Sequence, residues 1–212
     1  MVANFSFAQN EKIEITFLGN CGFFMTDGSL NIYVDFPYKS GSYRYMTYRP
    51  GLVDSVHANS VFLYTHGHAD HYSKKAFKKT NQKLYGPWPV KFLLAKKRKY
   101  KLDDLNDSLP GFSITEFKTK HALSYKHLSY LVEWNHKRIF ILGDTHIADT
   151  LASIKNLDLV FAPPWVLYDA MDKNFKIDAK KIILYHLRSG ENIPVTSDKI
   201  IILQQDQKFV IE

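Results

Sequence analysis

The sequence has very little cysteine: Cys21 is the only one in 212 residues. A single cysteine excludes an internal disulfide and a cluster of thiolate metal ligands, so any metal is expected to be held by nitrogen and oxygen atoms. The sequence also lacks an apolar run of about 20 residues, the length that a membrane-spanning helix requires. Because no repeat, low-complexity tract or Gly/Ser linker divides the chain, we predict one domain, residues 1–212, without a membrane partner.

The chain is basic, with a formal net charge of +7. A positive charge of this size suits an anionic substrate or nucleic acid. Much of the excess lies in two lysine-rich runs, Lys74–Lys79 and Lys96–Lys101, which we interpret as solvated faces of helices. Residues 1–9 have no basic segment and only a short apolar stretch, which predicts a cytoplasmic protein; export stays open if they are the end of a longer signal peptide.

The most informative segment is Thr65-His66-Gly67-His68-Ala69-Asp70-His71, which places three histidines and one aspartate within six residues. The apolar stretch directly before it, Val61–Tyr64, predicts a buried strand. Imidazole and carboxylate groups bind divalent metals at neutral pH because each offers a lone pair without strong deprotonation. The segment therefore predicts part of a metal site, in preference to a polar turn that happens to be rich in histidine.

Three further candidate ligands follow predicted strands. His121 comes soon after the strand predicted at Phe112–Phe117, Asp144 ends an apolar run, and His186 ends another. Open α/β sheets bind ligands just outside the carboxyl ends of their strands. We therefore expect these side chains to converge with the histidine segment at one edge of a sheet.

The remaining pattern, many strands with few helices between them, predicts a layered α/β sandwich. Apolar residues alternate over 13–17, and Asp27-Gly28 between two apolar stretches predicts a hairpin. Residues 36–59 predict a long surface loop. Ser73 is expected to cap a helix through Lys79. Further helices are predicted at Pro89–Lys99 and Ile147–Ile154, and further strands at Leu128–Trp134, Arg138–Leu142, Leu157–Ala162, Lys181–Tyr185 and Lys199–Leu203.

Taken together, these residues resemble the metallo-β-lactamase superfamily, especially its branch of small metal-dependent hydrolases. The likeness lies in the segment His66-x-His68-x-Asp70-His71, in Gly143-Asp144-Thr145 and in the positions of His121 and His186. The opening stretches Ile15–Gly19 and Val34–Pro37 also resemble the first strands of that superfamily. The resemblance implies a four-layer αββα sandwich, a single metallo-hydrolase domain over residues 1–212, and a two-metal site in a cleft at one sheet edge.

The resemblance also implies a ligand set. It implies that the first metal is held by His66, His68 and His121, the second by Asp70, His71 and His186, and that Asp144 bridges the two. His127 and His146 are rivals of His121 for the third position on the first metal. A set of nitrogen and oxygen donors suits zinc best, with manganese or iron permitted.

Asp35 is expected to accept a hydrogen bond from a ligand imidazole, although a turn-forming role before Phe36-Pro37 is an alternative. Two cations that share a hydroxide activate it near neutral pH and polarise the bond under attack. The expected activity is therefore hydrolysis of an ester, lactone or phosphodiester, with Asp70 and Asp144 as candidate catalytic residues that orient the hydroxide or accept its proton.

Candidate substrate-binding residues lie near the last ligand. Arg188, two positions beyond His186, favours a small anionic substrate. The other candidates are Trp165, Tyr168 and the loop residues Tyr38, Lys39, Arg44 and Arg49. Two alternatives stay open: a nuclease acting on RNA or DNA, favoured by the run Lys96–Lys101, and a non-catalytic binding protein with a vestigial metal site.

Overall fold

The computed structural model describes residues 12–39, 49–188, 191, 193 and 197–212. Across these residues the strands form two six-stranded sheets, with the orders β12-β1-β2-β3-β4-β5 and β11-β10-β9-β8-β7-β6. The first sheet consists of β1 (Ile13–Gly19), β2 (Gly22–Thr26), β3 (Asn31–Val34), β4 (Val61–Leu63), β5 (Lys83–Tyr85) and β12 (Lys208–Ile211). The second consists of β6 (Phe112–Thr119), β7 (His127–Trp134), β8 (Lys137–Ile141), β9 (Leu157–Ala162), β10 (Ala179–Leu184) and β11 (Ile200–Ile202).

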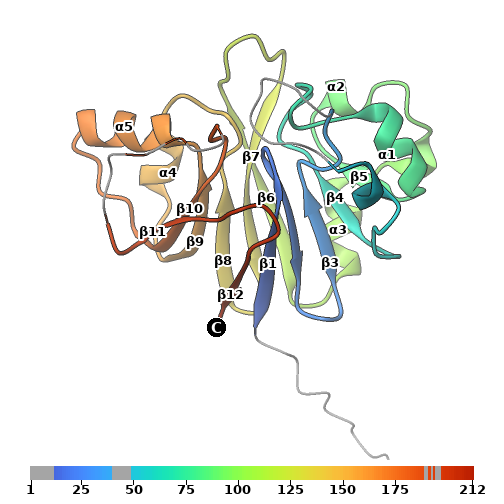
Figure 1. Cartoon of the computed structure of the whole chain (residues 1–212), viewed down its shortest axis with the longest axis horizontal. Helices are drawn as coiled ribbons and strands as arrows, with labels where there is room; N and C mark the ends of the chain where they lie inside the picture. Colours follow the sequence, from blue (N-terminus) through green and yellow to red (C-terminus); the bar gives the residue numbers. More distant parts are fainter. Residues whose placement is uncertain (1–11, 40–48, 189–190, 192, 194–196) are drawn as a thin grey trace, which may run out of the picture.

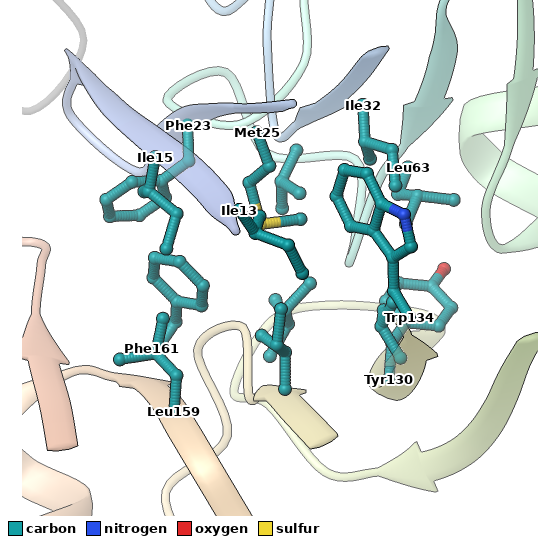
Figure 2. Close-up of a cluster of buried hydrophobic side chains, with 14 of the residues drawn as sticks. Ile13, Ile15, Phe23, Met25, Ile32, Leu63, Tyr130, Trp134, Leu159 and Phe161 are labelled. Atoms are coloured by element: carbon teal, nitrogen blue, oxygen red, sulfur yellow. The ribbon is translucent and has the colours of Figure 1, made fainter. Parts of the chain in front are cut away.

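The two sheets pack face to face around the main hydrophobic core. Strand alternation turns Ile13 and Ile15 of β1 inward, where they are fully buried. Figure 2 shows Ile15 pointing toward Phe161 of the second sheet, and both belong to the same core cluster as Ile13 and Tyr130. Burial of each such side chain contributes about 1.5–3 kcal/mol, so this interface holds the two sheets together.

Helices cover the two outer faces. In Figure 1, α1 (Lys74–Thr80) and α2 (Trp88–Lys91) lie on the side of the first sheet, and α4 (Asp149–Ser153) and α5 (Pro164–Asp172) on the side of the second. Phe77 of α1 packs on Phe62 of β4, and Val166 of α5 packs on Val160 of β9. The predicted αββα sandwich is confirmed. None of the helices in the described ranges has the length and hydropathy of a membrane span.

The elements differ from the sequence predictions in several places. Ser73 caps α1 as expected, since its hydroxyl accepts a hydrogen bond from the Ala76 amide. The helix predicted over 89–99 is wrong beyond Lys91, because Phe92 is extended and Leu93 has a φ of +58°. A separate 3₁₀ turn, Lys96–Arg98, follows. The helix predicted over 147–154 is shorter than expected. Five elements of the described residues were not predicted: β5, β12, α3 (Leu102–Ser108), α5 and the 3₁₀ helix Pro50–Val53, which lies in the stretch predicted as a loop.

The site lies at the edge where the parallel strands of both sheets end. Strand β4 is parallel to β3, and β10 and β8 are both parallel to β9, so their carboxyl ends reach this edge. The sheets are also tied together here: the Leu128 amide donates to the Thr65 carbonyl at 2.9 Å, and the Tyr130 hydroxyl donates to the Tyr64 carbonyl at 2.7 Å. The loops that leave the two sheets therefore face one another.

Candidate metal centre

The ligand candidates named from the sequence converge on one carboxylate oxygen, Oδ2 of Asp144. His71 Nε2 and His186 Nε2 each lie 3.0 Å from this atom. His66 Nε2 lies 3.9 Å and His121 Nε2 4.0 Å from it. Asp144 is 2% exposed, so its carboxylate is almost inaccessible to solvent, and four imidazoles surround it.

His66, His68 and His121 form one group, with ligand nitrogens within 4.8 Å of one another. His68 Nε2 lies 3.3 Å from the Leu123 carbonyl, so Nε2 carries the proton and Nδ1 keeps a lone pair. That Nδ1 lies 3.1 Å from His121 Nε2. Two nitrogen ligands of a tetrahedral zinc ion are about 3.3 Å apart, given metal–nitrogen bonds of about 2.0–2.1 Å. This group has the dimensions of one half of a metal centre.

The two rivals of His121 lie outside this group. His127 uses both ring nitrogens: Nε2 accepts from the Asp144 amide at 2.8 Å, and Nδ1 lies 2.7 Å from the Thr119 hydroxyl. His146 is exposed and its ring stacks on that of His121 at 5.2 Å. His127 is therefore a residue that positions Asp144, a role that the sequence did not indicate.

The second group contains Cys21, His71, Asp144 and His186, with ligand atoms again within 4.8 Å of one another. Asp70 joins it through Oδ2, which is 3.3 Å from His186 Nε2. The single thiol of the chain therefore lies among these donors, beside the nitrogen and oxygen atoms expected from the sequence. Counting cysteines excluded a thiolate cluster but did not exclude one thiol beside histidines.

Asp35 fixes the orientation of His71. Its buried carboxylate accepts hydrogen bonds of 2.8 Å from the Thr65 amide, the Thr65 hydroxyl and His71 Nδ1. Because Nδ1 donates to Asp35, Nε2 is the nitrogen of His71 that faces Asp144. Carboxylates that hold a ligand histidine in this way also raise its basicity.

The backbone before Asp144 requires glycine. Gly143 has a φ of +62°, and a Cβ atom there would lie 2.4 Å from His127 Nε2 and 2.7 Å from the Thr65 Cβ. A turn this tight brings the Asp144 amide onto His127 and directs the carboxylate toward the histidines.

The two halves of the centre differ in charge. Burial alone would raise the pKa of Asp144, but the charges and hydrogen bonds of His71 and His186 hold it well below its usual range. Burial lowers the pKa of His186, but its hydrogen bonds with Asp144 and Asp70 raise it, so the net pKa is about 9. In the other half, burial lowers the pKa of His121 to about 4. The pKa of His121 is therefore lowered in the first half, whereas in the second half the pairing with carboxylates raises the pKa of His186.

With this geometry in place, comparison with known families is decisive. Residues 14–185 match the sequence profile of the β-lactamase superfamily domain, which covers most of the chain. The chain belongs to the metallo-β-lactamase superfamily. No protein of curated function matches it by sequence.

Several solved structures share the fold of this chain, but their sequences are only 12–15% identical to it. A metallo hydrolase of Ignicoccus hospitalis, Igni18, is 14% identical with a TM-score of 0.68, and 95% of this chain matches 99% of that one. The metallo-β-lactamase fold protein YhfI of Bacillus subtilis is 15% identical, with a TM-score of 0.65 and coverages of 94% and 99%. A diphosphatase of the PhnP family is 12% identical, with a TM-score of 0.65 and coverages of 94% and 97%. These likenesses establish the fold of a metallo-hydrolase.

Several buried polar atoms of the site have no hydrogen-bond partner among the described residues, as expected of atoms that bind cations. Within the described residues, His66 Nε2, Asp70 Oδ1 and Asp144 Oδ1 are buried without a hydrogen-bond partner. Buried polar atoms are almost always satisfied, since an unsatisfied one costs about 1–3 kcal/mol, and more when it is charged. Three such atoms beside two sets of ligand-type side chains match the donors that divalent metals take. The residues present fit the binding of divalent metal ions.

The predicted substrate-binding residues are only partly brought to the centre. Trp165 lies beside it, with its ring 4.8 Å from that of His186 and its Nε1 donating to the Thr145 carbonyl. Tyr168 and Arg188 are exposed, and over the described ranges neither side chain makes a hydrogen bond or ring contact with the ligand groups.

The four candidates from the predicted loop lie in different surroundings, and one of them lies outside the described residues. The expectation that Tyr38 lines a cleft is wrong: it is buried, and its hydroxyl donates to the Leu18 carbonyl. Arg49 forms an ion pair with Asp206, and Lys39 is exposed. Arg44 lies outside the described residues, as do residues 1–9.

Proposed function

We propose that this chain is a two-metal hydrolase that cleaves a phosphodiester, ester or lactone bond in a small anionic substrate. The observation that carries the proposal is the convergence of two groups of ligand atoms on Asp144 Oδ2. One carboxylate oxygen between two such groups is the arrangement expected of a bridging ligand. A single ion would need only one of the groups.

In this proposal the first ion is held by His66, His68 and His121, the second by His71, His186 and Asp70, and Asp144 bridges them. Zinc suits the histidine-rich set best. When bound, two such ions would supply hydroxide at neutral pH and stabilise the charge that develops on the bond under attack.

The chain's own groups hold the reacting atoms in place and move the proton. His127 and the turn at Gly143 fix the Asp144 backbone, so its carboxylate keeps one orientation during the reaction. Asp70 is 2% exposed, and its Oδ1 atom makes no hydrogen bond within the described residues. We assign to this oxygen the acceptance of the proton from the attacking water, because a general base needs a free lone pair within reach.

A cavity of about 470 Å³ next to the centre supports an anionic substrate. It lies between α2 and the hairpin of β6 and β7, and His127 forms part of its wall. Three lysines outnumber the one carboxylate in its lining, Glu116, and aromatic side chains complete it: Lys91, Lys118, Lys126, Tyr85, Trp88 and Tyr125. The lysines suit a phosphate or carboxylate, and the rings suit a flat apolar group. A hollow of about 530 Å³ at the turn between β7 and β8 lies at the other end of these strands, away from the histidines.

The similar folds favour phosphorus chemistry among the candidate bonds. One of them is a diphosphatase, and another is the short form of human tRNase Z, which is 14% identical with a TM-score of 0.54, over 92% of this chain and 98% of that one. We therefore place the phosphodiester first. A nuclease activity is a second outcome of the same assay.

The test begins with metal analysis of the purified protein, for which we expect about two ions per chain. The metal-loaded protein is then assayed against bis-p-nitrophenyl phosphate, a panel of lactones, single-stranded RNA and nitrocefin. Glu133→Gln, at the far end of β7, is the matched control and should retain full activity. No metal binding after zinc or manganese is supplied would contradict the proposal, and activity on nitrocefin alone would overturn the substrate preference.

A further inference from the structure

Cys21 lies at the tight connection between β1 and β2, at the same edge as the metal centre. Asn20 before it has a φ of +51°, and the Asn20 carbonyl lies 3.4 Å from the His186 amide. This contact links the β1–β2 connection to the end of β10. The thiol is 1% exposed, and its Sγ lies within 4.8 Å of ligand atoms of His71, Asp144 and His186.

The thiol has two kinds of neighbour: Cys21 belongs to the main hydrophobic core, and its sulfur atom also lies beside ionisable side chains. A core thiol is surrounded by hydrocarbon. Here ionisable groups lie beside the thiol as well: burial raises the pKa of Cys21 well above its usual value, the charge of His71 acts to lower it, and that of Asp144 raises it further. A sulfur atom between an imidazole and a carboxylate has the neighbours of a metal ligand.

The dimensions of the group support the same conclusion. With zinc–sulfur bonds of about 2.3 Å and zinc–nitrogen bonds of about 2.0–2.1 Å, tetrahedral ligand atoms lie about 3.3–3.6 Å apart. All four donors fall within 4.8 Å of one another, so a small movement of side chains would bring them onto one ion. An independent observation points to a cation at the same place: Asp144 Oδ1 is buried and has no hydrogen-bond partner among the described residues.

We propose that Cys21 is a thiolate ligand of the second metal position, in addition to the donors His71, His186, Asp70 and Asp144. The inference rests on the proposed metal centre. On binding, the S–H bond breaks, an S–metal bond forms and the proton leaves to solvent. Because thiolates favour soft and borderline metals, this ligand selects zinc over magnesium and manganese. Asp70 keeps the role proposed above, with Oδ2 facing this ion beside His186 and Oδ1 available to accept the proton.

Cobalt(II) in place of zinc tests the proposal directly. The metal-free protein is titrated with cobalt in a thiol-free reductant, and the absorption spectrum is followed. A cobalt–thiolate bond produces a charge-transfer band in the near ultraviolet, whereas nitrogen and oxygen ligands alone produce only the weaker visible bands. Since Cys21 is the only cysteine, such a band can arise from no other residue.

We expect the near-ultraviolet band in the wild type, growing with the second equivalent of cobalt and absent from Cys21→Ser, which keeps visible bands. Cys21→Ser should also bind the second ion at least about 10–100-fold more weakly, the loss that removal of even an outer partner causes. His146→Ala is the matched control: this residue stacks on the ligand His121 but belongs to neither donor group, so its variant should keep the band.

The outcomes separate this inference from the proposed function. Visible bands without a near-ultraviolet band in the wild type would show that cobalt binds without Cys21. This result would refute the role of Cys21 and would still support the metal centre. No cobalt bands of either kind would contradict the metal centre itself. Because the wild-type spectrum alone can overturn the proposal, the result does not depend on whether Cys21→Ser folds.

Discussion

Replacing Asp35 with asparagine separates the positioning of His71 from every other feature of the centre. The side chain keeps its size, and Oδ1 can still accept from the Thr65 amide. The new NH₂ group faces His71 Nδ1, which is itself a donor at 2.8 Å. Flipping the amide only moves the conflict to the Thr65 N–H. One buried donor therefore loses its acceptor in either orientation.

The expected magnitude follows from two separate arguments. A hydrogen bond to a charged group is worth about 1.5–3 kcal/mol, so the metal-free variant should lose about 2 kcal/mol of unfolding free energy. Loss of a partner behind a ligand histidine weakens metal binding about 10–100-fold. That factor corresponds to a loss of about 1.4–2.7 kcal/mol in metal-binding free energy, which is similar in size to the expected loss of unfolding free energy.

Two measurements check this prediction: urea unfolding of the metal-free protein, and zinc titration against a competing chelator. Asp27→Asn is the control, since Asp27 is a buried carboxylate in the β2–β3 turn that accepts from Trp134 Nε1 and Asn135 Nδ2. It should lower stability by a similar amount and leave zinc affinity unchanged. If Asp35→Asn behaves like this control in both assays, the reasoning about His71 is refuted.

Three further predictions concern single groups. Asp144→Ala should reduce hydrolysis to background with an unchanged circular dichroism spectrum; retained turnover would show that the bridge is misassigned. Gly143→Ala should cost about 3 kcal/mol from overpacking against His127 and the left-handed φ, measured by urea unfolding, and an unchanged midpoint would contradict the predicted overlap. Burial would raise the pKa of Asp27, but the amides of Leu30 and Ser29 hold it below its usual value. Its contribution is therefore present above about pH 4 and lost as pH falls through the folded pKa, so the stability gap between wild type and Asp27→Asn should shrink in acid.

The candidate ligands could be brought together from the sequence because several of them directly follow strands. An apolar run that ends in His or Asp indicates both the strand and the side of the sheet on which its last residue lies. His66 after β4, Asp144 after β8 and His186 after β10 are all of this kind. Parallel strands then place their carboxyl ends at the same edge, so the hydrophobic pattern and the topology of a parallel sheet were sufficient to predict that these side chains lie close together.

The residues that support the ligands could not be located in this way. His127 begins a strand, and its contact with the Asp144 amide depends on the exact turn at Gly143. Cys21 lies in a connection between antiparallel strands, where no apolar run points to a site. Its distance from His186 is set by the packing of one sheet on the other, which neither segment encodes alone.

Errors in the predicted elements have a similar origin. The stretch after Pro89 has residues that favour a helix, but Leu93 adopts a left-handed φ and its neighbour Leu94 is buried against the first sheet. Tertiary burial therefore outweighed local propensity. The missed strand β5 is three residues long, and it is a strand only because β4 pairs with it.

The same dependence on sheet packing explains why the centre has two unlike halves. Thr65 and the histidines after it leave the first sheet, whereas Asp144 and His186 leave the second, and the two sheets meet through the bond from Leu128 to the Thr65 carbonyl. Asp144 reaches across to His71 of the first sheet, so the second position is assembled from both layers. The Asp144 carboxylate can therefore reach both groups of candidate ligands only when the sheets are correctly packed, so the geometry of the candidate metal centre depends on the hydrophobic core between them.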